Sequence, residues 1–155
     1  MYVRLIEPDD EHAYRTILER MSDEDRYYRF FHPADSLAPE AVRRFVEPRP
    51  DMLGVIAVED GEPLGAAHGA LLDARSAELA IVIARGARSR GVGRALLLAL
   101  MAELRARGYT RFVANALYEN RPFARLARSA GLHVDHSHGP AVFWVRDLEQ
   151  RPLVN

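Results

Sequence analysis

Apolar residues follow two spacings along the chain, and together they predict a sheet with helices on its faces. Short apolar runs between turn residues are typical of strands, whereas apolar residues three and four positions apart are typical of helices. The strand-like runs are residues 2–6, 52–58, 64–72, 78–83, 110–117, 132–138 and 141–145. The helix-like segments are residues 8–21, 26–31, 39–46, 94–107 and 120–130. This order predicts an α/β (α+β) domain with a mixed central sheet of about seven strands.

Turn and cap residues mark several of these boundaries. Ser22 lies three positions before Asp25 and predicts a helix start. The pair Asp60 and Gly61 is typical of a two-residue hairpin turn. Gly108 and Gly131 follow the last two helix-like segments, where glycine commonly ends a helix. The glycines at positions 65 and 69 are expected to weaken their strand or to mark bulges.

Composition narrows the class of protein. A chain of 155 residues suits one domain, so we expect residues 1–155 to form a single domain. The absence of Cys excludes disulfides, thiolate metal sites and a cysteinyl intermediate. A net charge of -1 gives no broad attraction to nucleic acid or an anionic membrane. No apolar run reaches the roughly 18–20 residues of a membrane span, so we expect a soluble cytoplasmic protein.

A basic, glycine-containing loop lies between a strand-like run and the strongest helix-like segment. The first amides of a helix lack intrahelical partners and carry partial positive charge, so they bind anions. Gly91 and Gly93 would let an anion approach the backbone, and Arg88, Arg90 and Arg94 would add charge. The alternative is a surface loop with solvated arginines. The loop therefore indicates a phosphate site without establishing one.

Two other phosphate-binding motifs fit this loop less well. Residues 91–96 supply only two of the three glycines of a dinucleotide fingerprint, and no acidic residue ends the next strand at residues 113–116. A Walker motif requires Lys, and the chain contains none.

Residues 88–93 (Arg-Ser-Arg-Gly-Val-Gly) resemble the signature Arg/Gln-x-x-Gly-x-Gly/Ala of the GNAT acetyltransferases. In that family an Asn follows the next strand and opens another helix, and Asn120 matches it. These landmarks cover roughly residues 78–132, and the element order extends the similarity to nearly the whole chain. The resemblance implies a GNAT fold, in which two central parallel strands splay apart to bind acyl-CoA.

A narrower resemblance is also present. Residues 26–33 (Arg-Tyr-Tyr-Arg-Phe-Phe-His-Pro), 77–83 and 119–122 are similar to segments of the Pat-type bacterial protein lysine acetyltransferases. Those proteins often carry an acyl-CoA-synthetase-like or a cyclic-nucleotide-binding domain, and neither fits within this chain. The resemblance therefore implies a stand-alone catalytic domain.

The GNAT resemblance implies acetyl-CoA as the acyl donor. Its pantetheine arm would lie along the strand at residues 78–83, and its pyrophosphate would lie on the amides at residues 91–94. The implied cofactor-binding residues are Ile81, Val82, Ile83, Arg88, Arg90, Gly91, Val92, Gly93, Arg94, Ala95, Asn120 and Phe123. Two of these have ordinary structural alternatives, because Asn120 is also a natural helix N-cap and Phe123 a natural core residue.

Acyl transfer to an amine requires a base, and Glu78 is the candidate. On a strand, Glu78, Ala80 and Val82 share one face, and an apolar setting makes a carboxylate a better base. The placement resembles that of the catalytic Glu of Pat-type enzymes; the alternative is a solvated charge. Many GNAT enzymes have a Tyr seven residues after the Asn that acts as the general acid, but this chain has Ala127 at that position. Tyr118 is a weak substitute, and we assign no general acid.

Histidines near the C-terminus raise the question of a metal. His136 and His138 would lie on one face of a strand and His133 on the other, which is a poor arrangement for a metal site. We therefore expect no metal.

The expected function is direct transfer of an acetyl or short acyl group from acetyl-CoA to a primary amine in a ternary complex. The acceptor is either a protein lysine or a small-molecule amine. Two alternatives are a non-catalytic acyl-CoA sensor and a nucleotide-binding regulatory module. The resemblance also allows a homodimer.

Overall fold

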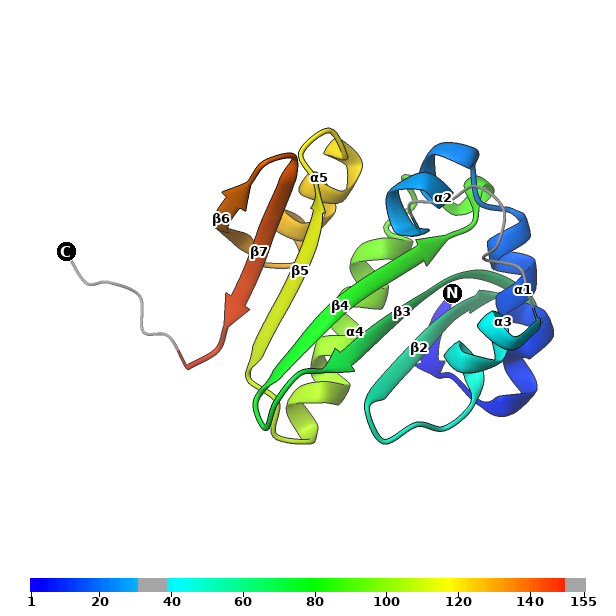
Figure 1. The fold of residues 1–155 in the computed structure, drawn as a ribbon. Helices are drawn as coiled ribbons and strands as arrows, with labels where there is room; N and C mark the ends of the chain where they lie inside the picture. Colours follow the sequence, from blue (N-terminus) through cyan, green and yellow to red (C-terminus); the bar gives the residue numbers. More distant parts are fainter. Residues whose placement is uncertain (31–38, 150–155) are drawn as a thin grey trace.

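The computed structural model describes residues 1–30 and 39–149, which form a seven-stranded sheet with helices on both faces (Figure 1). The strands are β1 (Tyr2–Leu5), β2 (Met52–Glu59), β3 (Glu62–Leu71), β4 (Ser76–Ile83), β5 (Arg111–Leu117), β6 (His133–His138) and β7 (Ala141–Asp147). The helices are α1 (Glu11–Glu19), α2 (Asp23–Phe30), α3 (Pro39–Val46), α4 (Val92–Ala106) and α5 (Arg121–Ser129), with short 3-10 turns η1 (Pro8–Asp10) and η3 (Arg85–Ala87). The mixed α/β fold class expected from the sequence is confirmed.

The strand order is β1-β2-β3-β4-β5-β7-β6. Every neighbouring pair is antiparallel except β4 and β5, which are parallel and joined through α4. A parallel pair needs a crossover connection, and the helical segment between residues 83 and 111 supplies it. The single parallel pair therefore joins two antiparallel parts of the sheet, one formed by β1 to β4 and the other by β5, β7 and β6.

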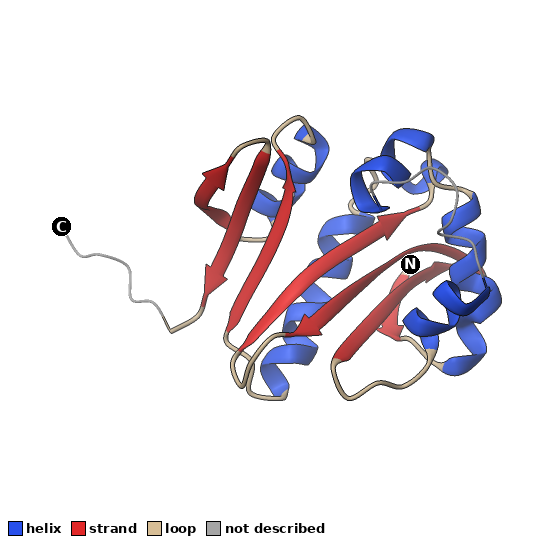
Figure 2. Ribbon diagram, viewed as in Figure 1, coloured by secondary structure: helices blue, strands red, loops and turns tan. Residues whose placement is uncertain are grey.

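Side-chain alternation sends two apolar sets to opposite faces of the sheet. Val55 and Ala57 of β2 pack in the cluster that contains α4 and α5, whereas Ile56 packs with α1 and α3. Ala77 and Leu79 of β4 belong to the α4 cluster, and Val82 belongs to the α1 cluster. Figure 2 shows α4 crossing behind the strands. The two faces of β4 thus meet different helices.

The two β3 glycines act mainly through packing. A Cβ at Gly69 would lie 2.9 Å from Leu104 of α4, and one at Gly65 would lie 2.8 Å from the carbonyl oxygen of Val82. Gly69 keeps its register with both neighbouring strands, so the expected bulge is absent there. Gly65 does lie beside a register shift, between Ala57 and its β2 neighbour. Glycine lets α4 and β4 approach β3 closely.

Several boundaries differ from those expected. Strand β4 begins at Ser76, two residues earlier, and α4 begins at Val92 instead of Arg94. Helix α2 begins at Asp23 because the Ser22 hydroxyl accepts a hydrogen bond from the Asp25 amide, as the cap pattern predicted. The end of the Pat-like segment at residues 26–33 lies outside the described residues. None of the described helices has the length and apolar character that a membrane crossing requires.

Candidate active site

Strands β4 and β5 form a fork. Their parallel pairing has only three Cα partners, Ser76 with Arg111, Ala77 with Phe112 and Glu78 with Val113. Beyond Glu78 the strands separate, as Figure 1 shows, while β4 stays paired with β3 and β5 with β7 along their lengths. The edges of β4 and β5 inside the fork therefore carry backbone groups that no neighbouring strand satisfies, and such groups need a hydrogen-bond partner.

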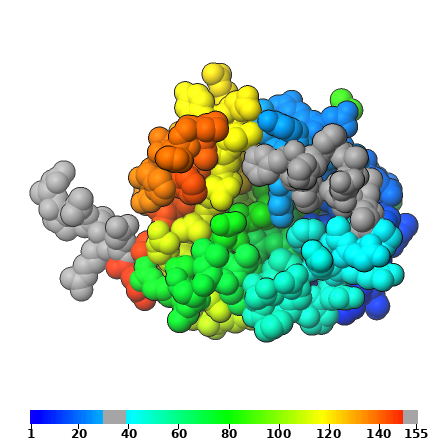
Figure 3. Space-filling view, in the orientation of Figure 1, coloured from blue at the N-terminus to red at the C-terminus, as the bar shows by residue number. Residues whose placement is uncertain are grey.

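A cleft of about 770 Å³ occupies the fork. Its size suits a cofactor, since ligand sites usually span roughly 300–1,000 Å³. In the space-filling view, green β4 lies recessed between the yellow β5–α5 region and blue α2 (Figure 3). The lining includes Met21, Asp25, Tyr28, Arg29, Glu78, Leu79, Ala80, Ile81, Ile83, Ala87, Arg88, Ser89, Gly91, Val92, Gly93, Arg94, Asn115, Ala116, Asn120, Pro122, Phe123, Arg125, Leu126 and Ser129. One cleft thus contains Glu78 and the anion loop.

The two glycines of the loop have different structural roles. Gly91 is the N-cap of α4 with φ +77°, and a Cβ there would meet no atom within 4 Å. At Gly93 a Cβ would lie 3.0 Å from Ile83 and 3.0 Å from Leu126, so glycine allows α4 to pack against β4 and α5. Gly91 therefore keeps the backbone open toward the cleft, whereas glycine is required at position 93 mainly because a larger side chain would disturb the packing of α4.

The three arginines of the loop lie in three different settings. Arg88 lines the cleft, and its Nε lies 3.6 Å from the Asp25 carboxylate of α2. Arg90 forms an ion pair with Glu59 of β2. Arg94 donates from Nε to the carbonyl oxygen of Ser129 at 3.2 Å, which ties the first turn of α4 to the end of α5.

Glu78 lies at the point where the fork opens. It is the last β4 residue with a partner on β5. Strand alternation places its side chain on the face of β4 that carries Val82, the face of α1 and α3. Glu78 is half-buried and lines the cleft. A carboxylate there can take a proton from a group that enters the fork from the α2 side.

Polar side chains from α2 and β5 also line this end of the cleft. Because Phe112 and Ala114 pack on the α4 face, Asn115 lies on the face of Glu78. Tyr28 of α2 lines the cleft, and burial together with the neighbouring Glu24 carboxylate raises the pKa of its hydroxyl. The sequence analysis assigns no individual role to Tyr28, which lies within the Pat-like segment at residues 26–33, or to Asn115, which lies in no motif.

His68 of β3 lies deeper on the same face. Its ring donates to the carbonyl oxygen of Phe45 at 3.1 Å and packs edge-on against Tyr14. Burial lowers the pKa of His68 to about 4, and the nearby Arg29 guanidinium contributes in the same direction. His68 is therefore neutral at ordinary pH and links α3 to the sheet.

Asn120 and Phe123 join the cleft wall to the local structure of α5. The Asn120 carboxamide oxygen accepts a hydrogen bond from the Phe123 amide at 3.2 Å, which confirms the expected cap. Both residues also line the cleft, so the cap leaves the Asn120 amide nitrogen available to a ligand. Ala127 is fully buried in the core. Tyr118 is 76% exposed and lines a different cavity, so neither position supplies a proton donor to this cleft.

Most of the residues expected to bind cofactor line the cleft, and three do not. Val82 is 2% exposed in the α1 cluster, because alternation turns it away from its neighbours Ile81 and Ile83. Arg90 is held by Glu59. Ala95 lies in the first turn of α4, where its amide donates to the carbonyl oxygen of Gly91 at 3.1 Å.

The histidines of β6 do not form a cluster. A register shift between Val134 and His136 interrupts the alternation expected for this strand. Instead, Nδ1 of His136 donates a hydrogen bond to the Asp135 carboxylate at 2.6 Å, and the His136 ring stacks on Phe143. Within residues 1–30 and 39–149, no group of three or more potential metal ligands is found.

Known proteins share this architecture. The crystal structure of the GNAT domain of PAT from S. lividans is 31% identical, with a TM-score of 0.87, and the match covers 94% of this chain and 89% of that one. PaiA N-acetyltransferase from Thermoplasma acidophilum, in complex with coenzyme A, is 13% identical, with a TM-score of 0.80 and coverage of 95% and 99%. Phosphinothricin acetyltransferase from Sinorhizobium meliloti, in complex with acetyl-CoA, is 22% identical, with a TM-score of 0.75 and coverage of 95% and 88%.

The match to the S. lividans domain confirms the narrower resemblance to Pat-type proteins that residues 26–33 and 77–83 indicated. The family model described as the Acetyltransferase (GNAT) family matches residues 12–132, which include the fork, the anion loop and α5. This chain belongs to the GNAT acetyltransferase family.

Proposed function

We propose that residues 1–155 act as one domain that transfers an acetyl or short acyl group from acetyl-CoA directly to a primary amine. The observation that carries the proposal is the fork between β4 and β5, which opens at Glu78 and leads to the amides of α4 within one cleft. A thioester at the opening would have a carboxylate on one side and unpaired strand backbone on the other.

Two features support acetyl-CoA as the donor. The loop before α4 presents the open amides of a helix start with Gly91 in the left-handed conformation, which suits a diphosphate. The unpaired edge of β4 between Leu79 and Ile83 suits the amide groups of a pantetheine arm, which can extend a sheet as a strand does. Coenzyme A and acetyl-CoA are the ligands of the two fold relatives described above.

The residues suit a single displacement through a ternary complex. The neutral amine attacks the thioester carbonyl carbon, a C–N bond forms, and the C–S bond then breaks. Glu78 takes the proton that the amine releases, and the departing thiolate takes a proton from water. A free backbone amide of β4 can donate to the developing oxyanion, which is a large source of rate enhancement in acyl transfer. No Cys is available for a covalent relay.

We propose a protein lysine as the first acceptor to test, since the α2 segment is similar to the Pat type and the S. lividans domain is 31% identical. The cleft also opens beside α2, where Tyr28 and Asn115 can contact an incoming side chain. A small-molecule amine would enter by the same route.

The test combines calorimetry with acetyl-CoA and a thiol-release assay on three acceptor classes, namely a protein mixture, lysine peptides and small amines. We expect acetyl-CoA to bind and at least one class to release free CoA together with an N-acetylated product seen by mass spectrometry. Binding without thiol release in any class would contradict catalysis and indicate an acyl-CoA sensor. Tighter binding of ATP or NAD than of CoA would indicate a nucleotide-binding module.

A further inference from the structure

Helix α5 carries a stripe of three exposed arginines, Arg121, Arg125 and Arg128. Their spacing of four and three residues places them along one side of the helix. No carboxylate of residues 1–30 and 39–149 lies within 4.0 Å of any of the three guanidinium groups. In contrast, Arg88 and Arg90 of the loop before α4 have acidic partners, Asp25 and Glu59. The α5 stripe therefore presents positive charge that the described protein leaves uncompensated.

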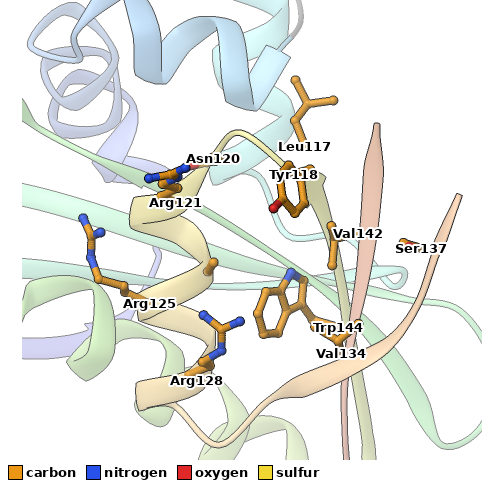
Figure 4. A pocket seen from close by; sticks show the side chains of 11 residues that line it. Leu117, Tyr118, Asn120, Arg121, Arg125, Arg128, Val134, Ser137, Val142 and Trp144 are labelled. Carbon is orange, nitrogen blue, oxygen red and sulfur yellow. The ribbon is translucent and has the colours of Figure 1, made fainter. Parts of the chain in front are cut away.

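The three side chains diverge. Arg128 extends toward the sheet and lies over the Trp144 ring at 5.1 Å from its centroid, in a second cavity of about 460 Å³ (Figure 4). Figure 4 shows the side chains of Arg121 and Arg125 extending away from Trp144. Arg125 also lines the large cleft, together with Leu126 and Ser129. All three arginines line the second cavity, and of the three only Arg125 also lines the large cleft.

The position of Arg125 relative to the anion loop is fixed by two contacts. The Arg94 side chain holds the carbonyl oxygen of Ser129 at 3.2 Å, and Leu126 packs beside Gly93. Arg125 precedes Ser129 by four residues, which is about one helical turn or roughly 6 Å along the axis. Its guanidinium can therefore reach a group that lies just outside a diphosphate bound at the start of α4.

In coenzyme A, the diphosphate is followed by a ribose with a 3′-phosphate, a few bonds further out. Arginine recognises phosphate with two parallel charge-assisted hydrogen bonds, which a partnerless guanidinium is free to make. We propose that Arg125, assisted by Arg121, binds the 3′-phosphate of the donor and makes the protein selective for CoA over dephospho-CoA. The proposal rests on the proposed function, because it takes the diphosphate position from that function.

The test is calorimetric titration of CoA and dephospho-CoA into the wild-type protein and into Arg125→Ala. We expect wild type to bind CoA about tenfold more tightly than dephospho-CoA, the factor expected of one charged hydrogen-bonding contact. In Arg125→Ala the preference should fall to about twofold, through weaker CoA binding alone, with dephospho-CoA affinity unchanged. The double variant Arg121→Ala/Arg125→Ala should abolish the preference.

Arg128→Ala is the matched control, since it removes the same charge from the same helix while its side chain lies over Trp144. It should keep the tenfold preference. The inference is overturned if wild type binds both compounds equally, if the double variant retains the full preference, or if Arg128→Ala loses it as Arg125→Ala does. Wild type that binds neither compound would instead overturn the proposed function, and the 3′-phosphate contact with it.

Discussion

The wall of the cleft that we propose for the donor, called the donor wall, is formed by the end of β4 and the first turn of α4 and consists largely of backbone and glycine. The wall that we propose for the acceptor, called the acceptor wall, is formed by α2 and the Glu78 face of β4 and β5 and consists of side chains from these three elements. The donor wall needs free amides and open space, which Gly91 supplies at φ +77°. The acceptor wall needs particular functional groups at particular places, which Glu78 and Asn115 supply.

The two walls should therefore tolerate different kinds of substitution. A change of side chain does not remove the backbone amides of the donor wall. It can weaken binding there only by filling the space in front of the amides or by changing the charge near them. A wall made of side chains can be altered group by group while the fold persists. Substitutions on the donor wall should therefore act on CoA binding, and those on the acceptor wall on turnover and acceptor binding.

The largest effect should come from Glu78→Gln, which removes the base and keeps the shape. We expect kcat to fall by about 100-fold or more, because a positioned general base typically contributes 10²–10⁴-fold. CoA affinity should change by less than about twofold, since Glu78 contributes no anion-binding group. Steady-state kinetics and calorimetry measure the two quantities. Glu119→Gln, an exposed carboxylate at the turn before α5, is the control and should remain active; equal loss in both variants would contradict a base role for Glu78.

The next effect concerns His68, which anchors the sheet behind the acceptor wall. Burial lowers its pKa to about 4 from 6.5, so below pH 6.5 the unfolded chain binds a proton that the folded chain does not. Folding stability should therefore be lost as pH falls from about 6.5 to about 4, by a total on the order of 3 kcal/mol from this group. Urea unfolding at several pH values should show a flatter profile for His68→Gln than for wild type. Parallel profiles would show that His68 does not control this loss.

A smaller effect should come from Asn120, where a cap and a cofactor contact coincide. Asn120→Ala should reduce stability by about 1 kcal/mol through loss of the cap on the Phe123 amide. Asn120→Ser keeps a capping oxygen and should restore most of that stability. If Asn120 also contacts the donor, Asn120→Ser should still bind CoA several-fold more weakly than wild type, because one hydrogen bond to CoA is lost. Wild-type CoA affinity in Asn120→Ser would show that Asn120 acts only as the N-cap of α5.

The smallest effect should come from Asn115→Ala on the acceptor wall. Loss of one neutral hydrogen bond to the acceptor should raise its KM by about 2–10-fold. The KM for acetyl-CoA should stay unchanged, because Asn115 lies on the Glu78 face of the sheet, which we assign to the acceptor. Kinetics with each substrate varied in turn would check this. A rise in the KM for acetyl-CoA alone would reverse the assignment of the two walls.

The sequence predicted the donor wall better than the acceptor wall, for a physical reason. The anion loop is contiguous, so glycine positions and helix start are visible in residues 88–94. The settings of its arginines are not visible, because Arg90 is drawn to Glu59, 31 residues away in sequence. Strand alternation turns the Val82 side chain away from those of Ile81 and Ile83, which a contiguous assignment of residues 81–83 does not distinguish.

The acceptor wall could not be assembled from the sequence, because its parts meet only in the folded sheet. Glu78 was identified through its place on a strand and a family resemblance, but its location at the fork depends on where β5 leaves β4. Asn115 reaches the same face through the register of β5, and Tyr28 through the packing of α2. The sequence likewise does not indicate a ligand-binding role for Arg125, since exposed arginines are common on helices and its neighbours across the cleft are known only from the structure.

The central claim, that the amides at the start of α4 hold the donor's diphosphate, is tested most directly by comparing Gly91→Glu with Gly108→Glu. Both glycines have positive φ, +77° and +95°, lie at opposite ends of α4 and leave open space for a side chain. Backbone strain should therefore cost each variant a similar amount, about 1–2 kcal/mol, which thermal unfolding can verify. We predict that calorimetry will show CoA binding weakened at least tenfold in Gly91→Glu and unchanged in Gly108→Glu. A folded Gly91→Glu variant that binds CoA as tightly as Gly108→Glu would contradict the account.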